Sequence, residues 1–239
     1  MARVQSPSSQ EIQDLFENLA PRYDLFNDFT SLGLARIWRN KTLSGLYPGM
    51  KVLDLGCGSG DLAIAAIRRV DPGGEVLGLD FSKSMLEVAR RRAALLPGSL
   101  RDRLNFLNEN AQNLPLEEKN FDAIVSGFVL RNLYENIDQI LQGILLSLKK
   151  GGQIRLLDMT LPKSRPGVFL FKFYMNHVAA FYGRLLFGKN FPTHYIAESA
   201  ERFFKAEEFV GRLRKAGFAG VRSQNLFLGM VTLYEGHKP

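Results

Sequence analysis

Several features are scarce in this sequence, and each scarcity excludes a class of protein. The chain holds one cysteine in 239 residues, which excludes a disulfide framework and suits a reducing compartment. The three histidines, His177, His194 and His237, show no metal-ligand spacing, so we expect no metal site. Neither a long apolar run nor the apolar core of a signal peptide is present, so we expect a cytoplasmic protein without a spanning helix.

Charge is unbalanced but not concentrated. The net charge is +7, from 31 Lys and Arg against 24 Asp and Glu. Such an excess favours nucleic acid or an anionic membrane surface as a partner. The only block is Arg90–Arg92, which falls near the end of a predicted helix, where basic residues more often form a solvated face. Length and composition fit one α/β domain over residues 1–239.

A glycine turn follows the first strongly apolar run, Val52-Leu-Asp-Leu-Gly-Cys-Gly-Ser-Gly-Asp61. Glycines lack a Cβ, so a ligand can press against their backbone. Asp80 ends the next apolar run, and an acidic residue there can accept both hydroxyls of a ribose. The pair predicts a nucleoside-containing cofactor over the ends of a parallel sheet. The alternative is a plain structural turn between strand and helix.

The spacing of the turn narrows the choice of cofactor. Its glycines are Gly56, Gly58 and Gly60, and Asp61 stands where a dinucleotide fingerprint would have its third glycine. No Lys-Ser or Lys-Thr follows, which excludes a P-loop. A carboxylate here is unfavourable beside a pyrophosphate but compatible with a ligand that carries a sulfonium and an ammonium. The segment resembles the first motif of class I S-adenosylmethionine-dependent methyltransferases, and that resemblance implies S-adenosylmethionine as cofactor.

Alternating strand and helix patterns predict a doubly wound, parallel α/β sheet of Rossmann-like type. We expect strands at 51–55, 75–79, 103–107, 121–126 and 153–159, and helices at 60–69, 84–95, 137–149 and 206–216. Two further apolar runs, 221–227 and 229–235, are so close that they must form an antiparallel C-terminal hairpin. Residues 1–48 are expected to form a helical cover, with one helix at 8–19, and residues 161–200 a helical insertion.

The ends of the second and third strands supply further candidate contacts to the cofactor. Phe81 follows Asp80 directly. Met85 lies one turn into the next helix, where it either packs on an adenine or belongs to the core. Asn110, after the third strand, either reads the adenine edge or caps a turn.

The loop after the fourth strand would face the reacting group. It holds no Asn-Pro-Pro-aromatic tetrad, which argues against methylation of exocyclic base nitrogens, and it offers Arg131 and Asn132 instead. Arg131 is a fixed cation that could stabilise a phenolate. The alternative is a salt bridge from Arg131 to Asp158 or Asp54 that holds the loop.

From about residue 12 to residue 238 the chain resembles the ubiquinone/menaquinone biosynthesis C-methyltransferases. The resemblance rests on Leu15–Asn27 with its Ala-Pro-Arg-Tyr-Asp segment, Asp54–Asp61, Asn110–Ala111, Gly127–Asn132, Tyr195–Ser199, Ala216–Phe218 and Asn225–Gly229. It implies cofactor contacts at Ser59, Asp80, Asn110 and Ala111. Tyr23 would belong to the cover that closes over the cofactor, or else pack at a helix break. Gly127 stands where relatives often have serine.

The resemblance implies methyl transfer from S-adenosylmethionine to a ring carbon of a reduced, prenylated naphthoquinol, converting demethylmenaquinol to menaquinol. Arg131 would stabilise the phenolate, and Asn132 and Tyr195 would position the ring. Asp158 would orient Arg131 or accept a proton through water. Three alternatives stay open: a benzoquinol of the ubiquinone pathway, an RNA substrate that exploits the positive charge, and a non-catalytic scaffold that binds S-adenosylmethionine.

The insertion carries a broad apolar face. Leu170, Tyr174, Val178, Phe181 and Leu185 recur at helical spacing. Such a helix could line a groove for a lipid tail, rest on the inner face of the cytoplasmic membrane, or pack on its own domain or on the second copy in a homodimer. No nucleic-acid-binding motif is present, so we expect no nucleic-acid partner.

Overall fold

The computed structural model describes residues 17, 22–114, 120–188 and 195–239. The helix predicted over 8–19 therefore lies, apart from Glu17, outside the described residues. The helices and strands are α2 (Tyr23–Ser31), α3 (Leu34–Thr42), η2 (Leu43–Gly45), β1 (Lys51–Leu55), α4 (Asp61–Val70), β2 (Glu75–Asp80), α5 (Lys83–Ala93), α6 (Gly98–Arg101), β3 (Leu104–Asn108), η3 (Ala111–Asn113), β4 (Phe121–Gly127), η4 (Leu130–Asn136), α7 (Ile137–Ser147), β5 (Leu148–Met159), α8 (Arg165–Phe173), η5 (Tyr174–Ala179), α9 (Ala180–Phe187), α10 (Tyr195–Arg202), α11 (Ala206–Lys215), β6 (Ala219–Asn225) and β7 (Val231–His237).

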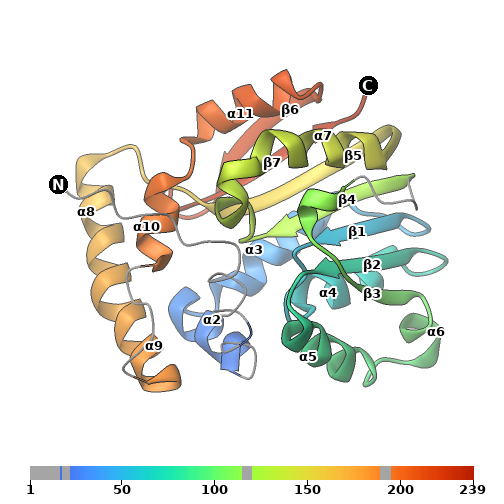
Figure 1. Cartoon of the computed structure of the whole chain (residues 1–239), viewed down its shortest axis with the longest axis horizontal. Coiled ribbons are helices and arrows are strands. Elements are labelled where there is room, and N and C mark those ends of the chain that lie inside the picture. Colours follow the sequence, from blue (N-terminus) through green and yellow to red (C-terminus); the bar gives the residue numbers. More distant parts are fainter. Residues whose placement is uncertain (1–16, 18–21, 115–119, 189–194) are drawn as a thin grey trace.

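A seven-stranded sheet in the order β3-β2-β1-β4-β5-β7-β6 forms the centre of the molecule (Figure 1). Strands β1 to β5 pair in parallel, while β7 is antiparallel to both β5 and β6. Strands β1, β2 and β3 follow one another from the middle of the sheet to one edge. The chain then returns to the middle, where β4 pairs with the other side of β1. The carboxyl ends of β1 and β4 therefore flank the switch point where ligands of such sheets bind. The predicted doubly wound sheet with a C-terminal hairpin is confirmed.

Side chains that alternate along the strands build one core on each face of the sheet. Leu53 and Leu55 of β1 pack with the apolar faces of α7 and α11. Val52, which directly precedes Leu53, points the other way and packs with α4 and α5. A strand that is buried on both faces needs apolar side chains in both directions, which explains why residues 52–55 are apolar apart from Asp54.

The structure shifts two predicted boundaries. The helix predicted to reach residue 149 ends at Ser147, and β5 begins directly afterwards at Leu148. The hairpin turn spans Leu226–Met230 and is not confined to Gly229, so both of its strands lie about two residues away from their predicted positions. Apolar Phe227 belongs to this turn because its ring packs on Trp38, with the centroids 5.7 Å apart.

The described parts of the predicted cover and of the predicted insertion contain helices. Helices α2 and α3 lie beside the carboxyl ends of the strands, and α8, η5 and α9 follow one another as a long column at the left of Figure 1. We call residues 165–187 the helical arm. Within the described residues, no helix combines the length and the apolar character that crossing a membrane demands.

Candidate active site

A cavity opens at the carboxyl ends of β1, β2 and β4, at the switch point of the sheet. Its walls come from the glycine turn, from the loops after β2, β3 and β4, and from the cover. The lining residues are Asn27, Arg39, Asp54, Gly56, Cys57, Gly58, Ser59, Asp61, Leu62, Leu79, Asp80, Phe81, Met85, Glu109, Asn110, Ala111, Gln112, Gly127, Phe128, Val129, Asn132 and Leu133.

The glycine turn has backbone conformations that favour glycine at its key positions. Gly56 has a φ of +68°, and a Cβ there would lie 2.5 Å from a methyl carbon of Val129. Gly58 has a φ of +52°, yet a Cβ there would meet no atom within 4 Å, so open space lies beside its backbone. Gly60 does not line the cavity. It is the N-cap of α4, and a Cβ would come 3.0 Å from that of Ala89, so its role is close helix packing.

Asp80 joins the glycine turn to the start of α5. One carboxylate oxygen accepts a hydrogen bond from the Gly58 N–H (2.8 Å) and the other accepts one from the Ser82 N–H (2.9 Å). Burial raises the pKa of this carboxyl above its usual range, while these amides oppose the shift. A carboxylate offers about four acceptor sites. Asp80 can therefore hold the turn and still accept hydroxyls from a ribose in the cavity.

Asp54 is the most unusual group in the cavity wall. Its carboxyl is almost fully buried, and neither oxygen accepts a well-formed hydrogen bond from the part of the chain that the structure describes. Burial, followed by the nearby charge of Asp80, raises the pKa of Asp54 to about 8, with the amide of Ala63 opposing weakly. A buried acceptor without a partner suits a ligand that brings a cation, such as the ammonium of S-adenosylmethionine. The residues present therefore fit that cofactor.

Ion pairs attach the cover to the glycine turn. Asp24 of α2 accepts a hydrogen bond from the Ser59 hydroxyl and pairs with Arg92 of α5 at 2.8 Å. Arg92 also pairs with Asp61, the first residue of α4, and Arg39 of α3 pairs with the other oxygen of Asp61. Two carboxylates and two guanidiniums thus connect four helices around the mouth of the cavity.

The N-terminal segment reaches the same rim. The Glu17 carboxylate accepts hydrogen bonds from the Lys83 and Ser84 N–H groups at the start of α5. Burial opposes ionisation of Glu17, but these bonds outweigh it and lower its pKa. Glu17 therefore attaches the predicted cover to the start of α5.

The structure contains the ion pair that was one of the two roles predicted for Arg131. Its guanidinium lies 2.9 Å from Asp158 and donates to the Phe128 carbonyl at 2.7 Å, and its backbone N–H donates to the second Asp158 oxygen at 3.0 Å. Both side chains are buried, and neither lines the cavity. The alternative, a salt bridge that holds the loop, is what the structure shows, with Asp158 and not Asp54 as partner. Stabilisation of a phenolate by Arg131 and proton transfer through Asp158 stay predictions.

The other predicted residues fall into two groups. Those that line the cavity are Gly56, Gly58, Ser59, Asp80, Phe81, Met85, Asn110, Ala111, Gly127 and Asn132. The Asn110 side chain also accepts a hydrogen bond from the Gln112 N–H, so the predicted turn cap exists alongside the cavity position. Tyr23 begins α2 and Tyr195 begins α10, but their side chains lie outside what the structure describes.

Sequence reasoning missed part of the wall. Asn27 and Arg39 come from the cover, Glu109 and Gln112 from the loop after β3, and Phe128, Val129 and Leu133 from the loop after β4. The glycine motif could not reveal the first two, because they approach it only through folding of the cover. The apolar residues beside Arg131 were visible in sequence, and their apolarity in a loop at the sheet edge was the available signal. Cys57 is buried, which raises the pKa of its thiol, so it acts as a small side chain.

Comparisons with known proteins agree with this geometry. Residues 4–238 match the model of the ubiE/COQ5 methyltransferase family. The ubiquinone/menaquinone biosynthesis C-methyltransferase UbiE of Haemophilus ducreyi is 34% identical over 231 residues, covering 96% of this chain and 88% of that protein. Demethylmenaquinone methyltransferase of Bacteroides fragilis is 31% identical over 232 residues, covering 96% and 93%.

A solved structure shares the fold. A SAM-dependent methyltransferase from Thermotoga maritima, described as a possible histamine N-methyltransferase, superposes with a TM-score of 0.64 at 21% identity, covering 95% of this chain and all of that one (100%). The family match covers almost the whole sequence, and the sheet order and the cavity at the switch point agree with it. The chain therefore belongs to the ubiE/COQ5 methyltransferase family and is an S-adenosylmethionine-dependent C-methyltransferase.

Proposed function

We propose that this enzyme methylates a ring carbon of a reduced, prenylated naphthoquinol, converting demethylmenaquinol to menaquinol. The family match over residues 4–238 is the observation that carries the proposal. The relatives named above act in menaquinone or ubiquinone biosynthesis, so a benzoquinol is the second candidate substrate. The RNA substrate and the non-catalytic scaffold have no support from a specific feature of the cavity.

The cavity wall suits a flat ring beside a charged cofactor. Asp54 and Asp80 lie on the β1–β2 side, whereas Phe128, Val129 and Leu133 form an apolar wall after β4. An apolar wall can hold the ring, and the polar side can hold the cofactor. Asn132 lies between Val129 and Leu133 in the same wall, so it remains our candidate for positioning a ring hydroxyl. Tyr195 remains a second candidate.

Arg131 and Asp158 are positioning residues in this proposal. Their ion pair fixes the backbone of the loop that carries the apolar wall and Asn132. A fixed wall aligns the ring carbon, which converts an encounter of two molecules into an oriented reaction.

When bound, S-adenosylmethionine supplies an electrophilic methyl group. Loss of a phenolic proton makes the reduced ring electron-rich at the adjacent carbon. That carbon then bonds to the methyl carbon, the old C–S bond breaks with its electrons on sulfur, and the ring carbon releases its proton to restore aromaticity. The oxidised quinone is electron-poor and should not react.

Product analysis tests this proposal. The enzyme is incubated with S-[methyl-²H₃]adenosylmethionine and a short-chain demethylmenaquinol, and the quinone is analysed by mass spectrometry after reoxidation. We expect a labelled methyl group on the ring, and none when the quinone is kept oxidised. A matched demethyl-benzoquinol measures the second candidate. Labelling of the benzoquinol alone, or of neither quinol, contradicts the naphthoquinol assignment.

A prenylated quinol resides in lipid, so the proposal also requires contact with a membrane from the cytoplasmic side. The predicted homodimer stays a prediction.

A further inference from the structure

The helical arm carries apolar side chains on two opposite faces. One face is buried: Phe171, Met175 and Ala179 pack with α10 and with Met230 beside the hairpin turn. The opposite face is open to solvent, although apolar side chains occupy it. An amphipathic helix of a globular protein normally places polar side chains there. The arm therefore has two apolar faces, of which packing within the described fold buries one.

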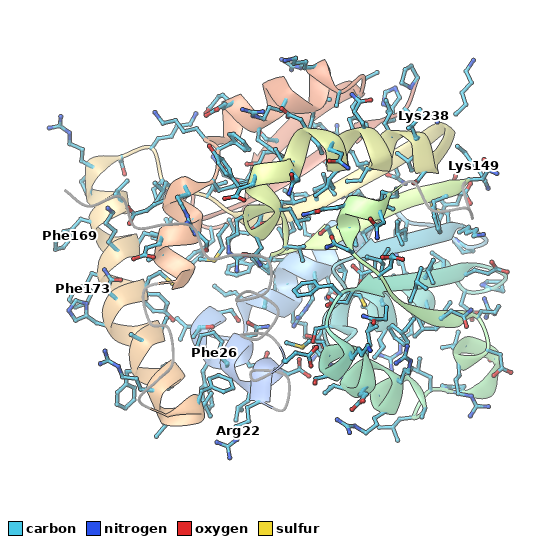
Figure 2. The ribbon with its side chains drawn as sticks, viewed as in Figure 1. Arg22, Phe26, Lys149, Phe169, Phe173 and Lys238 are labelled. Atoms are coloured by element: carbon cyan, nitrogen blue, oxygen red, sulfur yellow. The ribbon has the colours of Figure 1, made fainter. Side chains whose placement is uncertain are left out.

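We define the exposed stripe as Phe169, Phe173, His177, Phe181 and Leu185. The exposed fractions are 73% for Phe169, 49% for Phe173, 62% for Phe181 and 66% for Leu185. Successive residues of the stripe are four positions apart in the sequence. In a regular α-helix, each such step would turn the side chain by about 40° around the helix axis. The π-helical segment η5 has a wider turn and reduces this rotation. The stripe thus stays on one side of the arm, and Figure 2 shows Phe169 and Phe173 pointing away from the rest of the molecule.

The charged residues of the arm itself are all basic. Residues 159–197 contain no Asp or Glu, whereas Lys163, Arg165, Lys172 and Arg184 lie within or next to the arm. Lys163 and Lys172 pair with acidic residues of later helices, while Arg165 and Arg184 are exposed. Aromatic side chains flanked by exposed arginines are the combination that binds anionic lipid surfaces.

The arm also contacts the element that covers the cofactor cavity. Phe29 of α2 stacks on Tyr182 with the ring centroids 5.1 Å apart, and Arg22 donates to the Leu186 carbonyl at 2.6 Å. Helix α2 lines the cavity through Asn27 and exposes apolar side chains of its own, among them Leu25. Apolar surface is therefore exposed on both the arm and the helix that borders the cavity.

We propose that the exposed stripe docks on an anionic bilayer, with its aromatic rings in the acyl boundary and Arg165 and Arg184 at the headgroups. This deepens the proposed function, because the bilayer would be the source of the prenylated substrate. Charge favours lipid over a second copy of the chain, since two identical basic surfaces repel each other. The contact between arm and α2 places the docked surface next to the cavity.

Vesicle sedimentation tests the docking directly. The full-length enzyme is mixed with vesicles of phosphatidylglycerol and phosphatidylcholine, or of phosphatidylcholine alone, without substrate. We expect binding to the anionic vesicles that weakens as salt is added. Phe169→Ser with Phe173→Ser should reduce the partition coefficient by about tenfold or more, because interfacial binding scales with buried apolar area.

Matched variants separate docking from general loss of apolar surface. Leu95→Ser with Leu146→Ser removes two side chains of similar exposure, 87% and 54%, outside the arm, and should leave binding within about twofold. Arg165→Glu with Arg184→Glu should abolish the preference for anionic vesicles. The charge-matched pair Arg91→Glu with Lys215→Glu, on α5 and α11, should retain it.

Two results overturn the docking. One is equal vesicle binding by the stripe variant and the leucine variant. The other is a wild-type dimer in gel filtration that the stripe variant turns into a monomer, which would make the stripe a subunit interface. A water-soluble quinol without a prenyl tail separates the two proposals. The stripe variant should methylate it at the wild-type rate. If the wild-type enzyme methylates no quinol yet binds vesicles through the stripe, the substrate assignment fails and the docking stands.

Discussion

Asp54 should make folding stability fall as the pH rises. Its pKa is about 8 in the folded chain and about 3.9 in an unfolded one. Below the lower value both states hold the proton, so Asp54 has no effect. Between the two values the unfolded chain releases a proton that the folded chain keeps, which favours unfolding. The loss is complete above the higher value.

The size of this effect follows from the shift. Stability changes by about 1.4 kcal/mol for each pH unit between the two pKa values. From about pH 5 to about pH 8, Asp54 therefore costs at most about 3–4 kcal/mol. This is an upper limit, because Asp54 lines a cavity that water can enter. Asp54→Asn keeps the shape of the side chain but cannot ionise, so the variant should escape this loss.

Urea unfolding at several pH values measures the effect. The difference in unfolding free energy between wild type and Asp54→Asn reports the ionisation of Asp54 together with its electrostatic coupling to Asp80, because the remaining titrating groups are present in both proteins. The free energy of unfolding of the variant, relative to that of the wild type, should increase steadily as the pH rises. A difference that stays constant within about 0.5 kcal/mol from pH 5 to pH 8, below what core substitutions usually produce, would refute the reasoning.

Cofactor affinity, unlike folding stability, should increase as the pH rises. An ionised Asp54 offers a partner to an ammonium group, so S-adenosylhomocysteine, which carries the same ammonium and is chemically stable, should bind more tightly as the pH approaches 8. Asp54→Asn should weaken its binding by about tenfold to a hundredfold, because a hydrogen bond to a charged group contributes about 1.5–3 kcal/mol. Calorimetric titration that finds equal affinities would exclude Asp54 as the ammonium partner.

Three further perturbations test the rest of the site. Gly56→Ala should abolish binding of S-adenosylhomocysteine in calorimetry, because the new Cβ clashes with a valine side chain, whereas Gly151→Ala, also at positive φ but without a neighbour, should leave binding intact. Arg131→Ala should lower the free energy of unfolding by about 3–5 kcal/mol, because it leaves Asp158 charged and buried. The turnover rate of this variant should fall more than its cofactor affinity. If the variant is as stable as the wild type in urea, the ion pair does not hold the loop. Ser59→Ala removes one attachment of α2 to the glycine turn and should speed proteolysis of the N-terminal segment, and an unchanged cleavage rate would contradict that attachment.

The sequence anticipated most of the fold because the signals involved are local. Apolar runs such as Val52–Leu55 and breakers such as the Gly151–Gly152 turn locate strands and junctions through neighbours in the chain. The boundary at Ser147 and the hairpin turn were misplaced for the opposite reason. Phe227 is apolar because Trp38, nearly two hundred residues earlier, packs on it, and no local pattern reports such a contact.

The part of the cavity wall that we assign to the cofactor could likewise be predicted from the sequence. Gly56, Gly58 and Asp80 carry it through backbone conformation and strand position, which short motifs encode. The rest of the wall could not be predicted, because it is assembled from the cover and from two separate loops. Arg39 reaches the cavity while Arg131, the cation that the pattern favoured, turns to Asp158 inside the protein. Residue type fixes which charges exist, but only the packed chain decides which of them face a ligand and which face one another, since burial selects the partner for every charge that leaves water.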